Sequence, residues 1–108
     1  MEIFKELNNL GYKQYLPMTV EELDTLNIDS VEFSIEANLA FDWFRDKYNL
    51  VSEIFHNSEY EWKNWKYRFY WTTERLRLSN ISDGHYETYE EARLECLKKL
   101  IKIVELEK

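Results

Sequence analysis

The segment Trp65–Trp71 reads WKYRFYW and alternates with a period of two. Successive side chains of a β-strand point to opposite faces of the sheet. One face of this strand would carry Trp65, Tyr67, Phe69 and Trp71, and the other Lys66, Arg68 and Tyr70. The segment therefore predicts a strand with an aromatic core face and a largely cationic outer face.

Further strands are expected on both sides of this segment. Leu50–Phe55 is apolar and rich in β-branched residues, and Arg75–Leu78 repeats the alternation after a turn at Thr72–Glu74. Asp83-Gly84 is a second turn signal. These segments predict a small antiparallel sheet of two or three strands.

An amphipathic helix is expected before the strands, with Asp29 or Ser30 as its N-cap and Asn49 as its end. Its apolar positions recur at steps of three and four residues. They are Phe33, Ala37, Ala40, Phe41, Phe44 and Tyr48, whereas Glu36, Asp42, Arg45 and Asp46 are expected to turn away from the core.

A second amphipathic helix is expected after the strands, opened by the capping box Thr88–Glu91. Its apolar stripe consists of Tyr89, Ala92, Cys96, Leu100 and Ile103, widened by Leu97, Ile101 and Val104. The element order is α-β-β-β-α. Two helices packed on one face of a small antiparallel sheet make an α+β fold, whose other face is left to solvent or to a partner.

The N-terminal part predicts short helices. Ile3, Phe4, Leu7 and Leu10 fall on one helical face that ends at Gly11. The capping box Thr19–Glu22 predicts a helical turn or two over Val20–Leu26. With 108 residues, the chain is expected to be a single domain, with residues 1–29 as a helical extension of a core at residues 30–108.

The composition narrows the classes of partner. The net charge of −7 argues against a generic nucleic-acid binder and against an anionic membrane surface. The single cysteine, Cys96, cannot form an intramolecular disulfide, and no run approaches the roughly 20 apolar residues that span a bilayer. The N-terminus resembles no signal peptide, so a cytoplasmic location is expected.

A local basic surplus marks the strands as a candidate binding face. Residues 60–80 hold five basic and two acidic side chains. The candidate face consists of Lys66, Arg68, Tyr70, Arg75 and Arg77. It could bind RNA, single-stranded DNA or an acidic protein. The alternative is an ordinary solvated face whose charges pair with acids of the N-terminal part.

The acidic N-terminal part suggests a further hypothesis, an inhibitor that mimics nucleic acid with a row of carboxylates. The residues concerned are Glu21, Glu22, Asp24, Asp29, Glu32 and Glu36. A solvated helix face is the simpler interpretation of such a run.

No pattern predicts catalysis, a metal site or a cofactor. His56 and His85 have no partner histidine or cysteine at metal-ligand spacing. Cys96 falls on the apolar stripe of the last helix and is expected to be a core residue. His85 lies beside Asp83, but no motif places a nucleophile near this pair. We therefore expect no enzyme.

The order α-β-β-β-α resembles that of the double-stranded RNA-binding domain. Such domains begin their second helix with lysines, whereas Glu90 and Glu91 stand here. These carboxylates would repel phosphate, so the likeness concerns topology rather than function.

Two segments carry a closer family resemblance, FDWFRDKYNL at residues 41–50 and TYEEARLECLKKLI at residues 88–101. They resemble a group of short uncharacterised proteins of Bacteroides-type genomes, often in phage or prophage neighbourhoods. The likeness covers residues 38–104 and implies a mobile-element setting, in which small proteins bind host or viral partners. It implies no activity or cofactor.

The leading functional hypothesis is a non-enzymatic, phage-type binding domain that acts through protein–protein contacts. Leu39, Trp43 and Trp62 lie off the apolar stripes and could form an exposed patch. They could equally belong to the core or to the seam of a homodimer.

Overall fold

The computed structural model describes residues 2–56, 64–73, 80–82 and 84–107 of the chain. These residues form four helices and three strands. In chain order they are α1 (Ile3–Asn9), α2 (Val20–Leu23), α3 (Val31–Tyr48), β1 (Leu50–His56), β2 (Trp65–Trp71), β3 (Asn80–Ile81) and α4 (Tyr89–Glu107). The strands form one antiparallel sheet in the order β1-β2-β3, which confirms the predicted α+β class.

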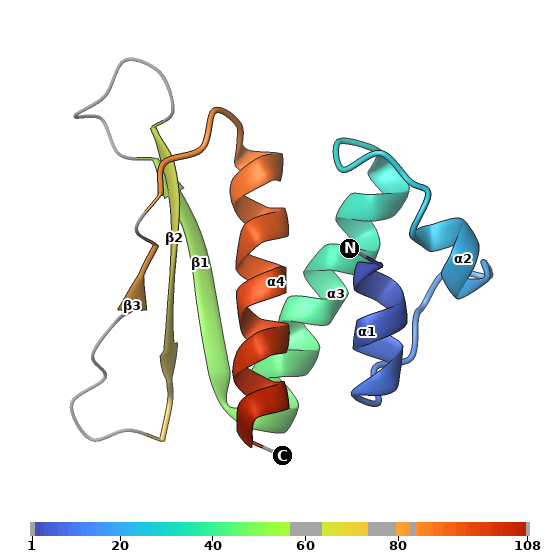
Figure 1. Cartoon of the computed structure of the whole chain (residues 1–108), viewed down its shortest axis with the longest axis horizontal. Helices are drawn as coiled ribbons and strands as arrows, with labels where there is room; N and C mark the ends of the chain where they lie inside the picture. Colours follow the sequence, from blue (N-terminus) through green and yellow to red (C-terminus); the bar gives the residue numbers. More distant parts are fainter. Residues whose placement is uncertain (1, 57–63, 74–79, 83, 108) are drawn as a thin grey trace.

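Both long helices lie on the same side of the sheet (Figure 1). α4 contacts β1 and β2, and α3 contacts β1 and α4. α1 and α2 lie beyond these helices, on the side away from the sheet. The molecule therefore has a sheet layer, a layer of two long helices, and an outer layer formed by the N-terminal helices.

The alternation predicted for β2 is confirmed at the centre of the strand. Tyr67 and Phe69 are buried, whereas Trp65 and Trp71 at its two ends are partly buried. In the register with β1, Tyr67 lies opposite Ile54 and Phe69 opposite Ser52. Because opposite residues share a face, the same side of β1 also turns toward the helices.

The third strand of the described residues comes shortly after the predicted segment. β3 consists of Asn80 and Ile81, which pair with Phe69 and Arg68 of β2. The predicted strand Arg75–Leu78 lies outside the described residues, as do Glu74 and Asp83 of the two predicted turns.

The predicted starts of α3 and α4 and the predicted end of α3 are confirmed. The Ser30 hydroxyl accepts a hydrogen bond from the Phe33 N–H, and the Thr88 hydroxyl accepts one from the Glu91 N–H. Thr19 and Glu22 form the complete capping box of α2, which ends at Leu23 and is shorter than expected. Asn49 ends α3 in the left-handed region with φ 56°, so β1 can begin at the next residue.

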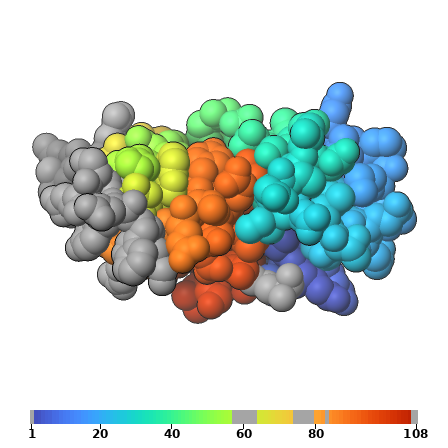
Figure 2. Space-filling view, turned by 90° about the horizontal axis from the view of Figure 1, so that it is seen from above, coloured from blue at the N-terminus to red at the C-terminus, as the bar shows by residue number. Residues whose placement is uncertain are grey.

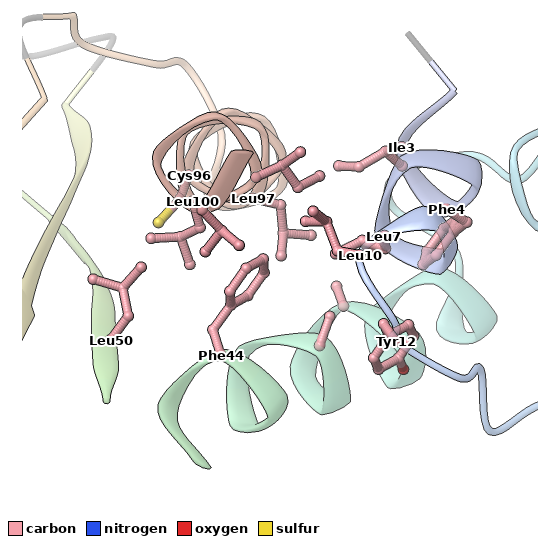
Figure 3. Close-up of a cluster of buried hydrophobic side chains, with 14 of the residues drawn as sticks. Ile3, Phe4, Leu7, Leu10, Tyr12, Phe44, Leu50, Cys96, Leu97 and Leu100 are labelled. Atoms are coloured by element: carbon pink, nitrogen blue, oxygen red, sulfur yellow. The ribbon is translucent and has the colours of Figure 1, made fainter. Parts of the chain in front are cut away.

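The N-terminal helix is part of the main core. Ile3, Leu7 and Leu10 point from α1 and the turn after it toward Leu97 of α4 and Phe44 of α3 (Figure 3). Leu50 of β1 reaches the same cluster from the other side. One hydrophobic core therefore joins residues of the predicted extension to residues of the predicted α-β-β-β-α unit.

Two side chains contradict the predicted helix faces. Glu36, expected to turn outward from α3, is completely buried. The chain after Gly11 folds back over α3 and supplies hydrogen-bond donors to this carboxyl group, so its burial is compensated. Gly11 permits the reversal because its φ of 109° is readily adopted only by glycine.

Tyr89, expected in the core stripe of α4, is exposed at the start of the helix, where its ring meets Trp65 edge-on.

Candidate functional site

The predicted basic face lies partly within the described residues. Lys66, Arg68 and Tyr70 occupy the face of β2 that points away from the helices, opposite the buried Tyr67 and Phe69. Arg75 and Arg77 lie outside the described residues. The structure therefore places three of the five candidate residues on one surface.

Arg68, at the middle of this face, is already paired. Its Nε and Nη2 donate hydrogen bonds to Oε2 of Glu53, the opposite residue on β1, at 2.9 and 2.7 Å. Its guanidinium also lies 5.1 Å from the ring centre of Phe55. The described part of the face is thus a mixed surface with a neutralised arginine, an arrangement that favours the solvated-face interpretation.

A second surface is apolar and lies on α3. Val31, Ile35 and Leu39 follow one another at four-residue steps and are 71%, 38% and 36% exposed. This spacing places them along one side of the helix. Tyr15 is 74% exposed, and it lines a hollow of about 540 Å³ together with Leu39. We name these four residues the α3 surface.

The three residues that were predicted to form an exposed patch differ in where the structure places them. Leu39 belongs to the α3 surface, Trp43 is half-buried, and Trp62 lies outside the described residues. The Trp43 ring packs edge-on against Tyr12 at 5.7 Å and lines the same hollow. Trp43 therefore serves as a fixed wall of the hollow rather than as a freely exposed side chain.

A buried hydrogen-bond network holds Tyr15 next to α3. The Glu36 carboxyl group accepts hydrogen bonds from the Tyr12 hydroxyl at 2.6 Å and from the Leu16 N–H at 2.5 Å. Glu36 and Leu39 are three residues apart, so they are neighbours on the helix. Tyr12 and Leu16, which precede and follow Tyr15 in the chain, are both hydrogen-bonded to Glu36. Tyr15 is therefore positioned beside Leu39.

The chain around the α3 surface is strongly acidic. Residues 19–46 contain eight acidic side chains and one basic side chain, Arg45. Arg45 forms ion pairs with Asp42 and Asp46, both on the rim of the hollow. Figure 2 shows α2 and the N-terminal half of α3 at one end of the molecule, with the strands at the other. The apolar side chains of α3 therefore lie on a segment with an excess of acidic residues, whereas the hollow itself is lined by Lys13 and Arg45 as well as by Asp42 and Asp46.

The proposed carboxylate row is partly used inside the fold. Asp24 accepts hydrogen bonds from the Phe4 and Lys5 N–H groups and so caps α1. Glu22 closes the capping box of α2, and Glu36 is buried. The remaining three, Glu21, Asp29 and Glu32, are exposed. A continuous row of six carboxylates is not present on the surface.

Of the α3 surface, only Leu39 was predicted from the sequence. Val31 and Ile35 could have been predicted too, because they form a second apolar stripe with Leu39 at four-residue steps. Tyr15 has no such signal, because its position depends on the contact between Leu16 and Glu36, which are 20 residues apart in sequence.

The histidines lie at the end of the sheet. The His56 ring meets Trp65 edge-on at 5.0 Å and hydrogen-bonds with the side-chain amide of Asn64. His85 is half-buried and precedes Tyr86, which is bridged to Trp65. In the described parts of the chain, no group of three His, Cys, Asp or Glu side chains could hold a metal ion. The absence of a catalytic site stays a prediction.

Cys96 is buried in the core, as its position on the apolar stripe predicted. Burial raises the pKa of its thiol to about 12, although a hydrogen bond with Ser52 acts in the opposite direction. Because the thiolate is the reactive form of cysteine, this environment disfavours nucleophilic chemistry at neutral pH.

Alkaline pH is expected to destabilise the fold through Cys96. The ordinary thiol pKa is 9.0, so the unfolded chain loses this proton earlier than the folded protein does. The stability linked to the thiol is complete below pH 9 and is lost as the pH rises from 9 toward 12. The loss is at most about 1.4 kcal/mol per pH unit.

Urea denaturation between pH 7 and pH 11 would measure this loss. Cys96→Ala should flatten the decline of the urea midpoint above pH 9. The buried Tyr12 hydroxyl, whose pKa is raised by burial and by Glu36, should then account for part of the remaining decline. An identical pH slope in wild type and Cys96→Ala would contradict the assignment.

No family model matches the chain, and no curated protein and no solved structure is similar to it. The likeness to the double-stranded RNA-binding domain therefore rests on element order, and Glu90 and Glu91 do occupy the first turn of α4. The resemblance to phage-type proteins stays a prediction. Within the described chain, no helix combines the length and the apolar character needed to cross a membrane.

Proposed function

We propose that this protein is a non-enzymatic binding domain of phage or prophage type, and that the α3 surface contacts a partner protein. The observation that carries the proposal is the run of three exposed apolar side chains on one side of α3, extended by Tyr15. Contiguous apolar surface of this kind is a common feature of protein interaction sites. A cytoplasmic location is part of the proposal, since the single cysteine requires no oxidising compartment.

The buried network supports a binding role for Tyr15. An interface gains affinity when its large side chains are held in place before binding, because less conformational freedom is lost. Tyr15 is tied to α3 on both sides through Glu36, and aromatic anchors of this type are enriched among the residues that dominate binding energy.

The charge around the α3 surface defines the chemistry of the partner. The exposed carboxylates Glu21, Asp29 and Glu32 accompany the apolar side chains. A complementary surface would offer an apolar groove bordered by lysine or arginine. The proposed partner is therefore a protein with a basic rim around an apolar patch.

The test compares two variants, one double and one single, that carry lysine at exposed apolar residues. Ile35→Lys/Leu39→Lys places two positive charges in the α3 surface. Leu106→Lys makes the same kind of change at a residue of α4 that is 87% exposed and lies outside that surface. Each protein would be used as bait in a host lysate, and the affinity of any captured protein would then be measured with purified components.

The double variant is expected to weaken binding of the captured protein about 100-fold, because anchor residues each contribute roughly 1–2 kcal/mol or more. Leu106→Lys should bind as wild type does. Equal binding by the double variant, or an equal loss in Leu106→Lys, would reject the α3 surface. If the partner is a second copy of the chain, sedimentation would show a dimer that the double variant abolishes.

A further inference from the structure

A cleft lies where the sheet extends past α4. α4 contacts β1 and β2, whereas β3 forms the outer edge of the sheet (Figure 1). Among the described residues, the helix-facing side of the sheet is therefore less covered near β3 than at its centre. A cleft of about 380 Å³ opens there between β2, β3 and α4.

The floor of the cleft is aromatic. It contains Tyr67 and Phe69, which are buried, and Trp71, which is partly buried. The Phe69 and Trp71 rings meet edge-on at 6.1 Å, with their planes at 78° to each other. A bound ring can therefore stack on one of them and meet the other edge-on.

The rim of the cleft is apolar on the α4 side, where Ile103 lines it. Ile81 of β3 also borders the cleft, but it pairs with Arg68, so its side chain lies on the outer face of the sheet. Asn80 adds a polar side chain at the mouth, whereas the Ser82 hydroxyl is already used, since it accepts from the Tyr67 N–H and donates to the Gly84 carbonyl. An apolar body would therefore contact Ile103 on the helix side, with the side-chain amide of Asn80 at the mouth of the cleft.

The α4 side of the cleft is positively charged. Lys99 lines it, and a neighbouring hollow of about 230 Å³ that shares Lys99 and Tyr67 is lined also by Lys98 and Lys102. Lys98 is paired with Glu95 at 3.0 Å. Lys99 and Lys102 form no ion pair with any described residue, although the chain as a whole carries a net charge of −7. Two lysines that have no ion pair among the described residues therefore stand beside an aromatic floor.

We propose that this cleft binds a small organic anion with a flat, aromatic body. The ring system lies against Phe69 and Trp71 beside Ile103, and the anionic group is held by Lys99 and Lys102. The volume falls within the range of about 300–1,000 Å³ that is usual for small-molecule sites. None of the lining residues belongs to the α3 surface, so the inference is independent of the proposed protein contact.

The chemistry can be tested with two dyes that differ in one group. 8-Anilinonaphthalene-1-sulfonate has an aromatic body and a sulfonate, and N-phenyl-1-naphthylamine has the same body without charge. The sulfonate is expected to bind with an affinity about tenfold or more above that of the neutral dye, as judged by fluorescence titration. Equal affinities would overturn the assignment of the anion to the lysines, and failure of the sulfonate to bind would overturn the site.

Charge reversal locates the binding. Lys99→Glu/Lys102→Glu should weaken sulfonate binding about tenfold or more, whereas Lys5→Glu/Lys66→Glu changes the net charge equally and should leave binding near the wild-type value. If both double variants weaken sulfonate binding equally, the loss reflects the net charge of the protein rather than these two lysines, and the site is rejected. Thermal unfolding of each variant checks that it is folded, since the dye also binds partly unfolded chains.

A structural readout separates this cleft from the α3 surface, which is also apolar. In a nitrogen–proton NMR titration, the sulfonate should shift the indole signal of Trp71 and the backbone signal of Ile81. Shifts confined to residues 15 and 31–39 would place the dye on the α3 surface and overturn the proposal.

Discussion

Replacement of Glu36 by alanine is expected to destabilise the folded protein by about 3–5 kcal/mol. The carboxyl group is completely buried and accepts hydrogen bonds from the Tyr12 hydroxyl and the Leu16 N–H. Each buried donor left without an acceptor costs about 1–3 kcal/mol, and a side-chain cavity adds to the loss. For a domain of this size, the melting temperature should fall by roughly 15–30 °C.

Urea denaturation followed by far-ultraviolet circular dichroism measures this effect. Glu32→Ala is the matched control, because Glu32 is an exposed glutamate of the same helix and its loss should stay within about 0.5 kcal/mol. Tyr12→Phe removes one of the two hydrogen bonds and should give an intermediate loss. If Glu36→Ala and Glu32→Ala unfold at the same urea concentration, the buried network does not stabilise the N-terminal segment.

The Glu36 network also connects stability to the proposed function. It ties the chain on both sides of Tyr15 to α3, so its loss should loosen Tyr15 before the whole domain unfolds. At a temperature where Tyr12→Phe remains folded, the affinity for a partner of the α3 surface is expected to fall. Unchanged affinity would show that Tyr15 is held by other contacts or does not take part in binding.

The second large effect concerns Arg93, a buried arginine of α4 that is 2% exposed. Its Nη1 donates to the Ser34 hydroxyl and its Nη2 to the Ile28 carbonyl, both at 3.0 Å. Its guanidinium lies between the rings of Phe33 and Tyr89, at 5.4 and 5.3 Å. No carboxylate of the described residues pairs with it, so two aromatic faces and two polar oxygens compensate only part of its burial, and its Nε has no hydrogen-bond partner among the described residues. Arg93 thereby joins α4 to the start of α3.

Arg93→Ala is expected to cost about 3–4 kcal/mol, because it removes both hydrogen bonds and leaves a cavity between two rings. Arg93→Lys should still cost about 2 kcal/mol, since an ammonium group cannot reach two oxygens and stack between two rings at once. Lys102→Ala is the control on the exposed side of the same helix. Thermal unfolding of the three variants gives the comparison, and a lysine variant as stable as wild type would contradict the stacked geometry.

Local patterns predicted most of the helices and strands. Capping boxes at Thr19 and Thr88 mark helix starts because the capping hydrogen bonds span only three residues. The period-two pattern of β2 correctly separated the buried Tyr67 and Phe69 from Lys66, Arg68 and Tyr70. The apolar stripe of α4 similarly placed Cys96 and Leu100 in the core.

The candidate site was less predictable from sequence. The basic face was a hypothesis from alternation alone, and the pairing of Arg68 with Glu53 depends on the register of two strands. The cleft was not predicted, because its aromatic floor was assigned to the core and its lysines belong to a helix about 30 residues further along the chain. Nothing in either segment indicates that α4 leaves the sheet uncovered near β3.

By itself, the sequence determined the α+β class, the starts of α2, α3 and α4 and the aromatic face of β2, since each depends on interactions within a few residues. Tertiary structure alone decided that Glu36 and Arg93 are buried, that Tyr15 lies beside Leu39, and that aromatic rings and lysines meet in one cleft. A charged side chain is expected on the surface unless the fold brings partners to it. Those partners, Tyr12 and Leu16 for Glu36, and Ile28 and Ser34 for Arg93, come from distant parts of the chain.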